Sequence, residues 1–195
     1  MQAEKLNPTE RTGAVIARSA GLGEPLDAQG RYLVECVGAD GSVKWTDSIE
    51  NLVVTVGKND LLDKYFAGTT YTAAWYMGLV DNNSFTAYAA GDTLASHTGW
   101  LEIATGTGYT AGGSATNRAT VSWNAAAAGS KASTTTAFAI TASITVLGAL
   151  LTVTQARGTS SNGGAGVLYS AGSFTGGART VVSGDTLNVT YTASV

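Results

Sequence analysis

The sequence predicts an all-β protein: a jelly-roll-like antiparallel β-sandwich with an extended N-terminal arm and one short helix. Three observations predict this fold. Many short stretches alternate apolar with polar residues, Gly-, Ser- and Asn-rich segments separate them, and a single stretch has a helical period. The chain has 195 residues, which is enough for one domain with a sizeable core.

Residues 1–30 are expected to form the arm. They contain both prolines of the chain, Pro8 and Pro25, and show no sustained helical or strand period. Two interpretations stay open: a disordered terminus, or an extended arm that becomes ordered against a neighbouring subunit. In the second case Arg11 and Arg18 are candidate contact residues.

Residues 31–67 are expected to form a hairpin, a further strand and the helix. An Asp-Gly pair at Asp40 and Gly41 between two apolar stretches is a strong hairpin signal. We expect the next strand to run over residues 49–56 and to close at Gly57. Asn59 is then the expected cap of a helix over residues 60–66, which ends at Gly68.

Residues 68–195 are expected to form the body of the sandwich, and residues 31–195 to form one folded unit. Strands are expected in seven places, with surface excursions at 104–116 and 157–166. The strands are 71–80, 117–123, 135–141, 145–154, 167–169, 180–182 and 186–192. The sequence Gly-Asp-Thr-Leu occurs at 91–94 and again at 184–187, either through a duplication or because Gly-Asp opens a turn and Thr-Leu begins a strand in both places.

Charge divides the chain near Gly68. Residues 1–66 hold 17 of the 25 charged residues (11 Lys and Arg, 14 Asp and Glu). The net charge of −3 and a pI near 5 lack the basic patch of a nucleic-acid binder. The N-terminus lacks the pattern of a signal peptide, and the apolar runs are too short to span a bilayer, so we expect a soluble protein made in the cytoplasm without a membrane partner. A charge-poor surface tends to associate, which favours a protein that works in an assembly.

The search for catalytic or metal-binding residues is mostly negative. One histidine, His97, and one cysteine, Cys36, are too few for the usual zinc site, and we expect a hydrogen-bonded structural His97 beside Trp100 and a buried Cys36. Asp92, Glu102 and Asp185 are isolated acids. They would suit glycoside hydrolysis, but in a charge-poor β-domain acids more often form turns. We therefore expect no enzyme, no cofactor, no metal and no small-molecule substrate.

Four tryptophans offer the remaining candidate contacts. They could form a sugar-binding platform together with Tyr76, although tryptophans in strands more often anchor a core; the residues are Trp45, Trp75, Tyr76, Trp100 and Trp123. Trp75 and Tyr76 are neighbours in one expected strand and must point to opposite faces. At least one of them is therefore a candidate for an intersubunit contact.

Several stretches resemble a known group of proteins. They lie at 44–45, 50–63, 74–79, 90–102, 117–118, 168–170 and 184–191, and together they span most of residues 31–195, with the arm outside. In these stretches the chain resembles small virion structural proteins encoded in tailed-phage genomes, whose closest functional analogy is to capsid decoration or cement proteins. The resemblance implies no catalytic motif.

The resemblance implies a structural component of the virion, located at the capsid surface. Its partners would be the major capsid protein and further copies of itself, as a dimer or trimer. The alternative is a tail, baseplate or fibre-adaptor protein involved in host attachment, which the Gly-, Ser- and Thr-rich composition and the spare aromatic residues support. A glycan-cleaving virion enzyme is the third hypothesis, supported only by the three isolated acids.

Overall fold

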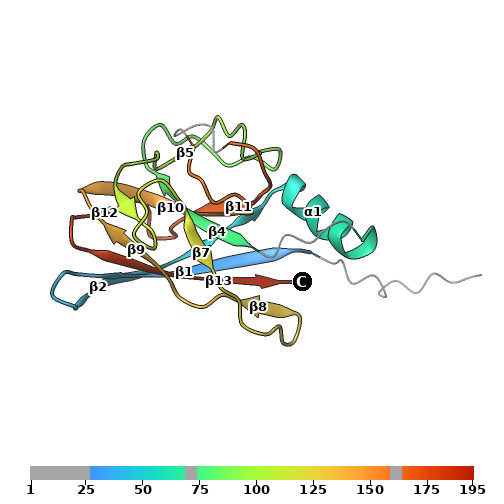
Figure 1. Cartoon of the computed structure of the whole chain (residues 1–195), viewed down its shortest axis with the longest axis horizontal. Helices are drawn as coiled ribbons and strands as arrows, with labels where there is room; N and C mark the ends of the chain where they lie inside the picture. The colour runs from blue at the N-terminus through green and yellow to red at the C-terminus, as the bar shows by residue number, and fades with distance from the viewer. Residues whose placement is uncertain (1–26, 69–73, 159–163) are drawn as a thin grey trace, which may run out of the picture.

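A computed structural model describes residues 27–68, 74–158 and 164–195, which form two antiparallel sheets that pack face to face (Figure 1). The first sheet has the order β2-β1-β13-β9-β6, with β8 paired to β13; the second has the order β3-β11-β10-β4-β5, with β12 paired to β10 and β7 to β4. The chain crosses repeatedly between the sheets, and one helix packs at an end of the sandwich. The predicted all-β sandwich with one short helix is confirmed.

The chain passes between the two sheets six times, mostly after runs of two or three strands in the same sheet. In chain order they are β1 (Gln29–Val37), β2 (Val43–Glu50), β3 (Leu52–Val53), α1 (Thr55–Phe66), β4 (Trp75–Asp81), β5 (Leu101–Glu102), β6 (Tyr109–Thr110), β7 (Ala119–Val121), β8 (Ser130–Ala132), β9 (Thr136–Ile140), β10 (Ile144–Thr152), β11 (Leu168–Ser173), β12 (Arg179–Val181) and β13 (Thr186–Ser194).

The first and last strands are partners at the centre of the first sheet. β1 pairs with β13 in continuous register from Gln29 opposite Ser194 to Val37 opposite Thr186. The charged first third of the chain therefore shares a sheet with the charge-poor end. Because β1 begins at Gln29, the last two residues of the predicted arm belong to the sheet. The remainder up to residue 26, with Arg11 and Arg18, lies outside the described residues.

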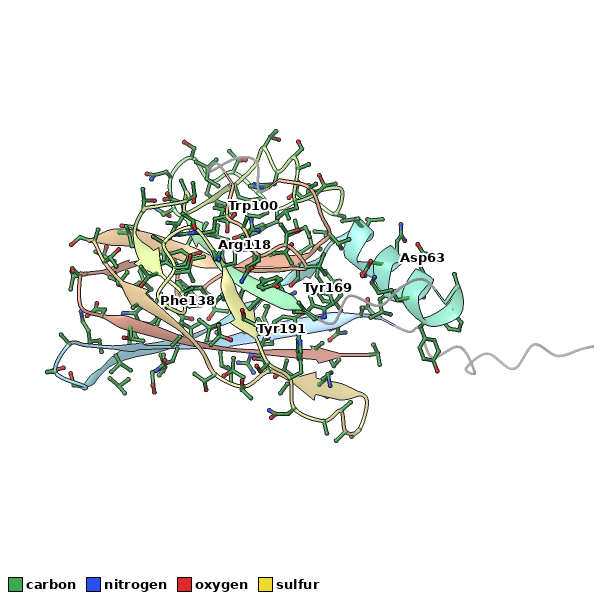
Figure 2. The ribbon with its side chains drawn as sticks, in the orientation of Figure 1. Asp63, Trp100, Arg118, Phe138, Tyr169 and Tyr191 are labelled. Carbon is green, nitrogen blue, oxygen red and sulfur yellow. The ribbon has the colours of Figure 1, made fainter. Side chains whose placement is uncertain are left out.

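The main core lies between the two sheets. Side chains alternate along β13, so that Leu187, Val189 and Tyr191 are fully buried while the residues between them are partly exposed. Tyr191 packs against Tyr32 of β1 with ring centroids 4.5 Å apart. In Figure 2, Phe138 and Tyr191 mark this interior.

A layer of loops covers the outer face of the second sheet. Trp100 and Leu94, which come from the loop between β4 and β5, are fully buried against Val80, Leu150 and Leu168 of the sheet. Both faces of β10 are thereby covered, which explains why this strand is buried from Val146 to Thr152 and reads as a continuous apolar run. Figure 1 shows the loops above β10 and β4, on the side away from β1 and β13.

The helix differs most from the sequence expectation. It begins at Thr55, so Thr55, Val56 and Gly57 are helical and the predicted strand over 49–56 is wrong beyond Val53. The predicted cap at Asn59 is wrong because the fold satisfies the helix start from elsewhere. The Val54 and Thr55 amides donate to the carbonyls of Tyr169 and Ala90 at 3.1 and 2.8 Å. The predicted end is confirmed: Gly68 follows the cap residue with a φ of +66°, a conformation that favours glycine.

Most other strands lie where the sequence predicts them. The hairpin at Asp40 and Gly41 is confirmed, with the Gly38 amide donating to the Ser42 carbonyl at 2.8 Å. β5, β6 and β8 are too short for a period to reveal and were not predicted. The loop at 104–116 was expected at the surface, yet its Tyr109 is fully buried in β6. Of the loop at 157–166, residues 159–163 lie outside the described residues. No helix in the described part of the chain has the length and apolar character needed to cross a membrane.

Candidate interaction surface

The isolated acids are each held by neighbouring groups. Glu102 is 1% exposed and receives two hydrogen bonds from Arg118, from Nε at 2.8 Å and from Nη2 at 2.6 Å. Arg118 also donates from Nη1 to the carbonyls of Thr154 and Ala156 at 2.8 and 2.7 Å. This buried pair connects β5 to the segment that holds Thr154 and Ala156, and the Glu102 carboxylate contacts the Arg118 guanidinium.

The two aspartates of the repeated Gly-Asp-Thr-Leu sequence make the same local turn. Oδ2 of Asp92 accepts from the Ala89 amide at 2.9 Å, and Oδ2 of Asp185 accepts from the Val182 amide at 3.0 Å. In each case the aspartate's own amide donates back to the carbonyl three residues earlier. The predicted Gly-Asp turn is confirmed at both places, although only the second turn leads into a strand, β13.

The buried Asp185 also contacts the buried Cys36 and the partly exposed Lys44. Lys44 Nζ lies 2.9 Å from Asp185 Oδ2, and the Cys36 thiol donates to the same oxygen at 3.8 Å. Burial by itself would raise the pKa of Asp185. The hydrogen bonds from Lys44 and the Val182 amide outweigh burial and keep that pKa below its ordinary value. Burial and the neighbouring carboxylate raise the pKa of Cys36 to about 11, so the thiol is a poor nucleophile.

His97 is a structural residue beside Trp100, as predicted. The two rings stack with centroids 3.9 Å apart, and His97 Nδ1 lies 3.0 Å from the Trp100 carbonyl oxygen. The Trp100 indole donates to Asp92 Oδ2 at 2.8 Å. Within the described ranges, no group of three or more His, Cys, Asp and Glu side chains is arranged to hold a metal ion.

The predicted aromatic contact residues lie in separate places. Trp45, in the first sheet, is partly buried against Phe174 and beneath Arg179. Trp75 lies on the inner face of the second sheet with Met77, whereas Tyr76 is on the outer face, which confirms their opposite orientations. Of the three predicted contact residues that the structure describes, Trp75 adjoins a cluster of exposed apolar side chains.

That area is formed by α1 and the strands beside it. Leu62, Tyr65 and Phe66 are 42%, 81% and 74% exposed, and the Tyr65 and Phe66 rings meet edge to face with centroids 5.0 Å apart. Among the described residues, these are three of the eight exposed large apolar side chains, and they fall within five consecutive positions. Clustered exposure of this kind marks a contact surface, whereas single exposed apolar residues need no explanation.

A groove of about 240 Å³ adjoins these side chains. Its walls are Leu61 and Tyr65 of α1, Trp75 of β4 and Tyr169 of β11, and Asp60 and Lys64 lie at its rim. The Trp75 and Tyr169 rings pack edge to face with centroids 5.4 Å apart. We call Leu61, Leu62, Tyr65 and Phe66, together with Trp75 and Tyr169, the α1 surface.

Close packing of α1 on β11 holds this surface in place. Gly57 is buried, and a Cβ at its position would lie 2.6 Å from the Tyr169 carbonyl oxygen, so only glycine lets the helix approach the strand this closely. The sequence pattern predicts Leu61, Leu62, Tyr65 and Phe66 on one face of the helix. In the structure Gly57 is buried and Leu61 is partly buried against the core, whereas Tyr65 and Phe66, in the last turn of α1, are mostly exposed.

The described chain begins beside the same helix. Asp27 forms an ion pair with Lys58 of α1 at 3.3 Å, and Lys64 pairs with Asp60 at 3.5 Å. The segment of residues 1–26 therefore joins the domain at the α1 end of the sandwich, where Figure 2 also shows Asp63 facing outward.

No protein-family model, curated protein or solved structure matches this chain. The arrangement of the α1 surface is therefore the principal guide to function.

Proposed function

We propose that this protein is a structural component of a phage particle, a capsid decoration or cement protein that binds the major capsid protein shell and stabilises it. The observation that carries the proposal is the α1 surface. It is a cluster of exposed apolar side chains at the end of the domain where the described chain starts, at Asp27. A binding surface beside a long terminal segment suits a protein that bridges neighbouring subunits.

The rest of the domain suits the same role. On the outer face of the first sheet two open hollows are lined mainly by Thr, Ser and Asn side chains together with the charged Arg31, Glu35 and Glu50. The acids that would serve a glycan-cleaving enzyme are held by Arg118, Trp100 and Lys44. A domain that binds through one apolar surface can stabilise a shell even if each contact is weak, because many copies on the same shell act together.

Binding to particles tests the proposal directly. The variant Tyr65→Ser with Phe66→Ser should keep its fold and lose most of its binding to purified particles from which the protein has been stripped. The matched control is Leu33→Ser, because Leu33 is 52% exposed on the outer face of the first sheet. If the double variant rebinds as well as the control, the α1 surface is not the contact. Binding to isolated tails instead of heads would favour the tail or fibre-adaptor alternative.

A further inference from the structure

We infer that a hollow between β7 and β9 is a binding site for a neutral saccharide unit, which it holds by hydrogen bonds to hydroxyl and amide side chains. This inference goes beyond the proposed function and does not rest on it, because the hollow shares no residue with the α1 surface. The tryptophans considered above for sugar binding lie elsewhere, and none of them lines the hollow.

The hollow exists because β7 and β9 meet at one end and belong to different sheets at the other. Where they meet, the Thr134 amide donates to the Ser122 carbonyl at 2.8 Å, and Trp123 forms a bridge with Ser133. Beyond this point β7 pairs with β4 of the second sheet, whereas β9 pairs with β13 of the first. The hollow that they leave measures about 380 Å³. This volume falls within the range of about 300–1,000 Å³ that is usual for small-molecule sites.

Neutral polar side chains dominate the lining of this hollow. Six of its eleven residues carry a hydroxyl or an amide, namely Ser114, Asn117, Thr120, Thr135, Thr136 and Gln155. Four more are alanines or glycine. The remaining residue, Arg118, directs its guanidinium to the Glu102 carboxylate and to two backbone carbonyls. The lining is therefore rich in groups that both donate and accept hydrogen bonds, and its single positive charge is neutralised by Glu102.

This composition decides which class of ligand fits. A metal cation requires carboxylates, and the lining, which lies wholly within the described residues, contains none. An anion would meet a guanidinium that is already bonded to Glu102, and an apolar ligand would find only alanine methyl groups. Sugar hydroxyls donate and accept hydrogen bonds, as the hydroxyl and amide side chains of the lining do. Without a pair of acids the site binds a sugar but does not hydrolyse it.

An extended peptide is the other neutral ligand class, and the hollow suits it less well. A peptide that adds to a sheet gains its affinity by pairing along a continuous strand edge. On the side of β9 away from β13, Thr134 bonds to Ser122 and Ala139 pairs with Thr110 of β6. Only residues 135–138 remain between these contacts, which is short for an added strand.

A buried hydroxyl in the wall of the hollow supports a bound ligand. Thr136 is 5% exposed, and its Oγ1 has no hydrogen-bond partner among the described residues. Buried hydroxyls in folded proteins nearly always have a partner from the protein, from water or from a ligand. Thr120, Thr135 and Gln155 are exposed and form the mouth of the hollow. A sugar that enters through this mouth supplies the partner that Thr136 lacks.

Local hydrogen bonds fix the backbone of the site before a ligand binds. Ser114 Oγ accepts from the Thr116 and Asn117 amides at 3.3 and 3.1 Å. The Arg118 amide donates to the Gln155 carbonyl at 2.7 Å. These bonds hold Asn117 and Gln155, whose amide side chains line the hollow. A site that is ordered in advance loses less entropy on binding.

Titration of the full-length protein with sugars, followed by amide NMR signals, tests the inference. The probes are the methyl glycosides of glucose, galactose, mannose and N-acetylglucosamine, and a neutral capped tripeptide serves for comparison. At least one glycoside should shift the signals of residues 117–120 and 135–137. Thr136→Val keeps the branched shape of the side chain and removes its hydroxyl, so it should weaken this binding about fivefold. Asn117→Ala should weaken it by about the same factor. The matched control is Thr190→Val, on the outer face of the first sheet, which should bind like the wild type.

The outcomes decide the inference as follows. Shifts at these residues that both variants weaken support it. Tighter binding of a matching trisaccharide would then identify a unit of a glycan chain as the ligand, and equal binding would identify the free sugar. The inference is overturned if no glycoside shifts these signals, in which case the hollow holds water only. Binding that Thr136→Val and Asn117→Ala leave unchanged, or binding of the tripeptide alone, would also overturn it. Because the titration uses the free protein, its failure leaves the proposed function to its own test.

Discussion

The loop layer over the second sheet and the α1 end of the domain place polar and apolar groups in opposite ways. The loop layer buries Asp92, His97, Glu102 and Arg118, whereas α1 exposes Tyr65 and Phe66. Glu102 is paired with Arg118, and Asp92 accepts a hydrogen bond from the Trp100 indole, and these contacts fix the conformation of segments that have little regular structure. The exposed aromatic residues contribute little to folding. The comparison teaches that polar groups maintain the fold at one end, while apolar groups are available for binding at the other.

The largest expected effect is at the centre of the loop layer. Arg118→Met should lower the free energy of unfolding by about 3–5 kcal/mol, because it leaves the Glu102 carboxylate buried without a cation. Chemical denaturation measures the loss. The double variant Arg118→Met with Glu102→Leu should recover a large part of it, since both charges are then absent. A single variant as stable as the wild type would mean that the pair does not organise this layer.

The next effect concerns Asp185, which is buried in the same manner at the end of the first sheet. Asp185→Asn should cost about 1.5–3 kcal/mol at neutral pH, because it removes the acceptor of charged and backbone hydrogen bonds.

The sign of the pH dependence follows from the lowered pKa of Asp185 in the folded state. The unfolded chain has the ordinary value of 3.8, so the stabilisation is present above that pH and is lost as pH falls through the lower folded pKa. The free energy of unfolding, measured by chemical denaturation at a series of pH values between about 5 and 2, should fall less steeply with falling pH for the Asn variant than for the wild type. Identical slopes would show that this carboxylate does not contribute to acid unfolding.

A smaller effect is expected where α1 meets the body. Gly57→Ala places a Cβ against the Tyr169 carbonyl and should cost about 1–3 kcal/mol, because the helix must move away from β11. Hydrogen exchange should increase in α1 and remain unchanged in β13. Ala128→Gly is a control, since Ala128 has a φ of +48° and glycine fits that conformation. If Gly57→Ala leaves the exchange of α1 unaltered, the helix is not held by this contact.

The smallest effect on stability is expected for the α1 surface itself. Tyr65→Ser with Phe66→Ser should change the free energy of unfolding by less than about 0.5 kcal/mol per site, because both side chains are mostly exposed. The same variant is expected to lose particle binding. Thermal unfolding tests the first half of this contrast. A loss as large as that of Arg118→Met would mean that α1 belongs to the folding core.

The sequence predicts the parts of this protein that depend on local patterns. Alternation reveals β2 and β9, a β-branched apolar run reveals β1, and the Asp-Gly pair reveals the first hairpin. The start of α1 could not be predicted, because the carbonyls that satisfy its first amides come from residues 90 and 169. The pairing of Arg118 with Glu102 is equally non-local in character, since it depends on the register of β4 with β5 and β7.

The candidate site was predicted only in part. Trp75 was singled out because adjacent residues in a strand face opposite ways, and it does line the groove. Tyr65 and Phe66 were not predicted as contact residues, although both belong to the expected helix. Two adjacent aromatic residues at the end of the expected helix were the available signal.

The most direct test of the account is cryo-electron microscopy of intact particles that carry this protein. The account predicts density for the β-sandwich at repeated positions over the head lattice, with the α1 surface against the shell. Density confined to the tail, or a head-bound sandwich whose α1 surface faces solvent, would contradict it.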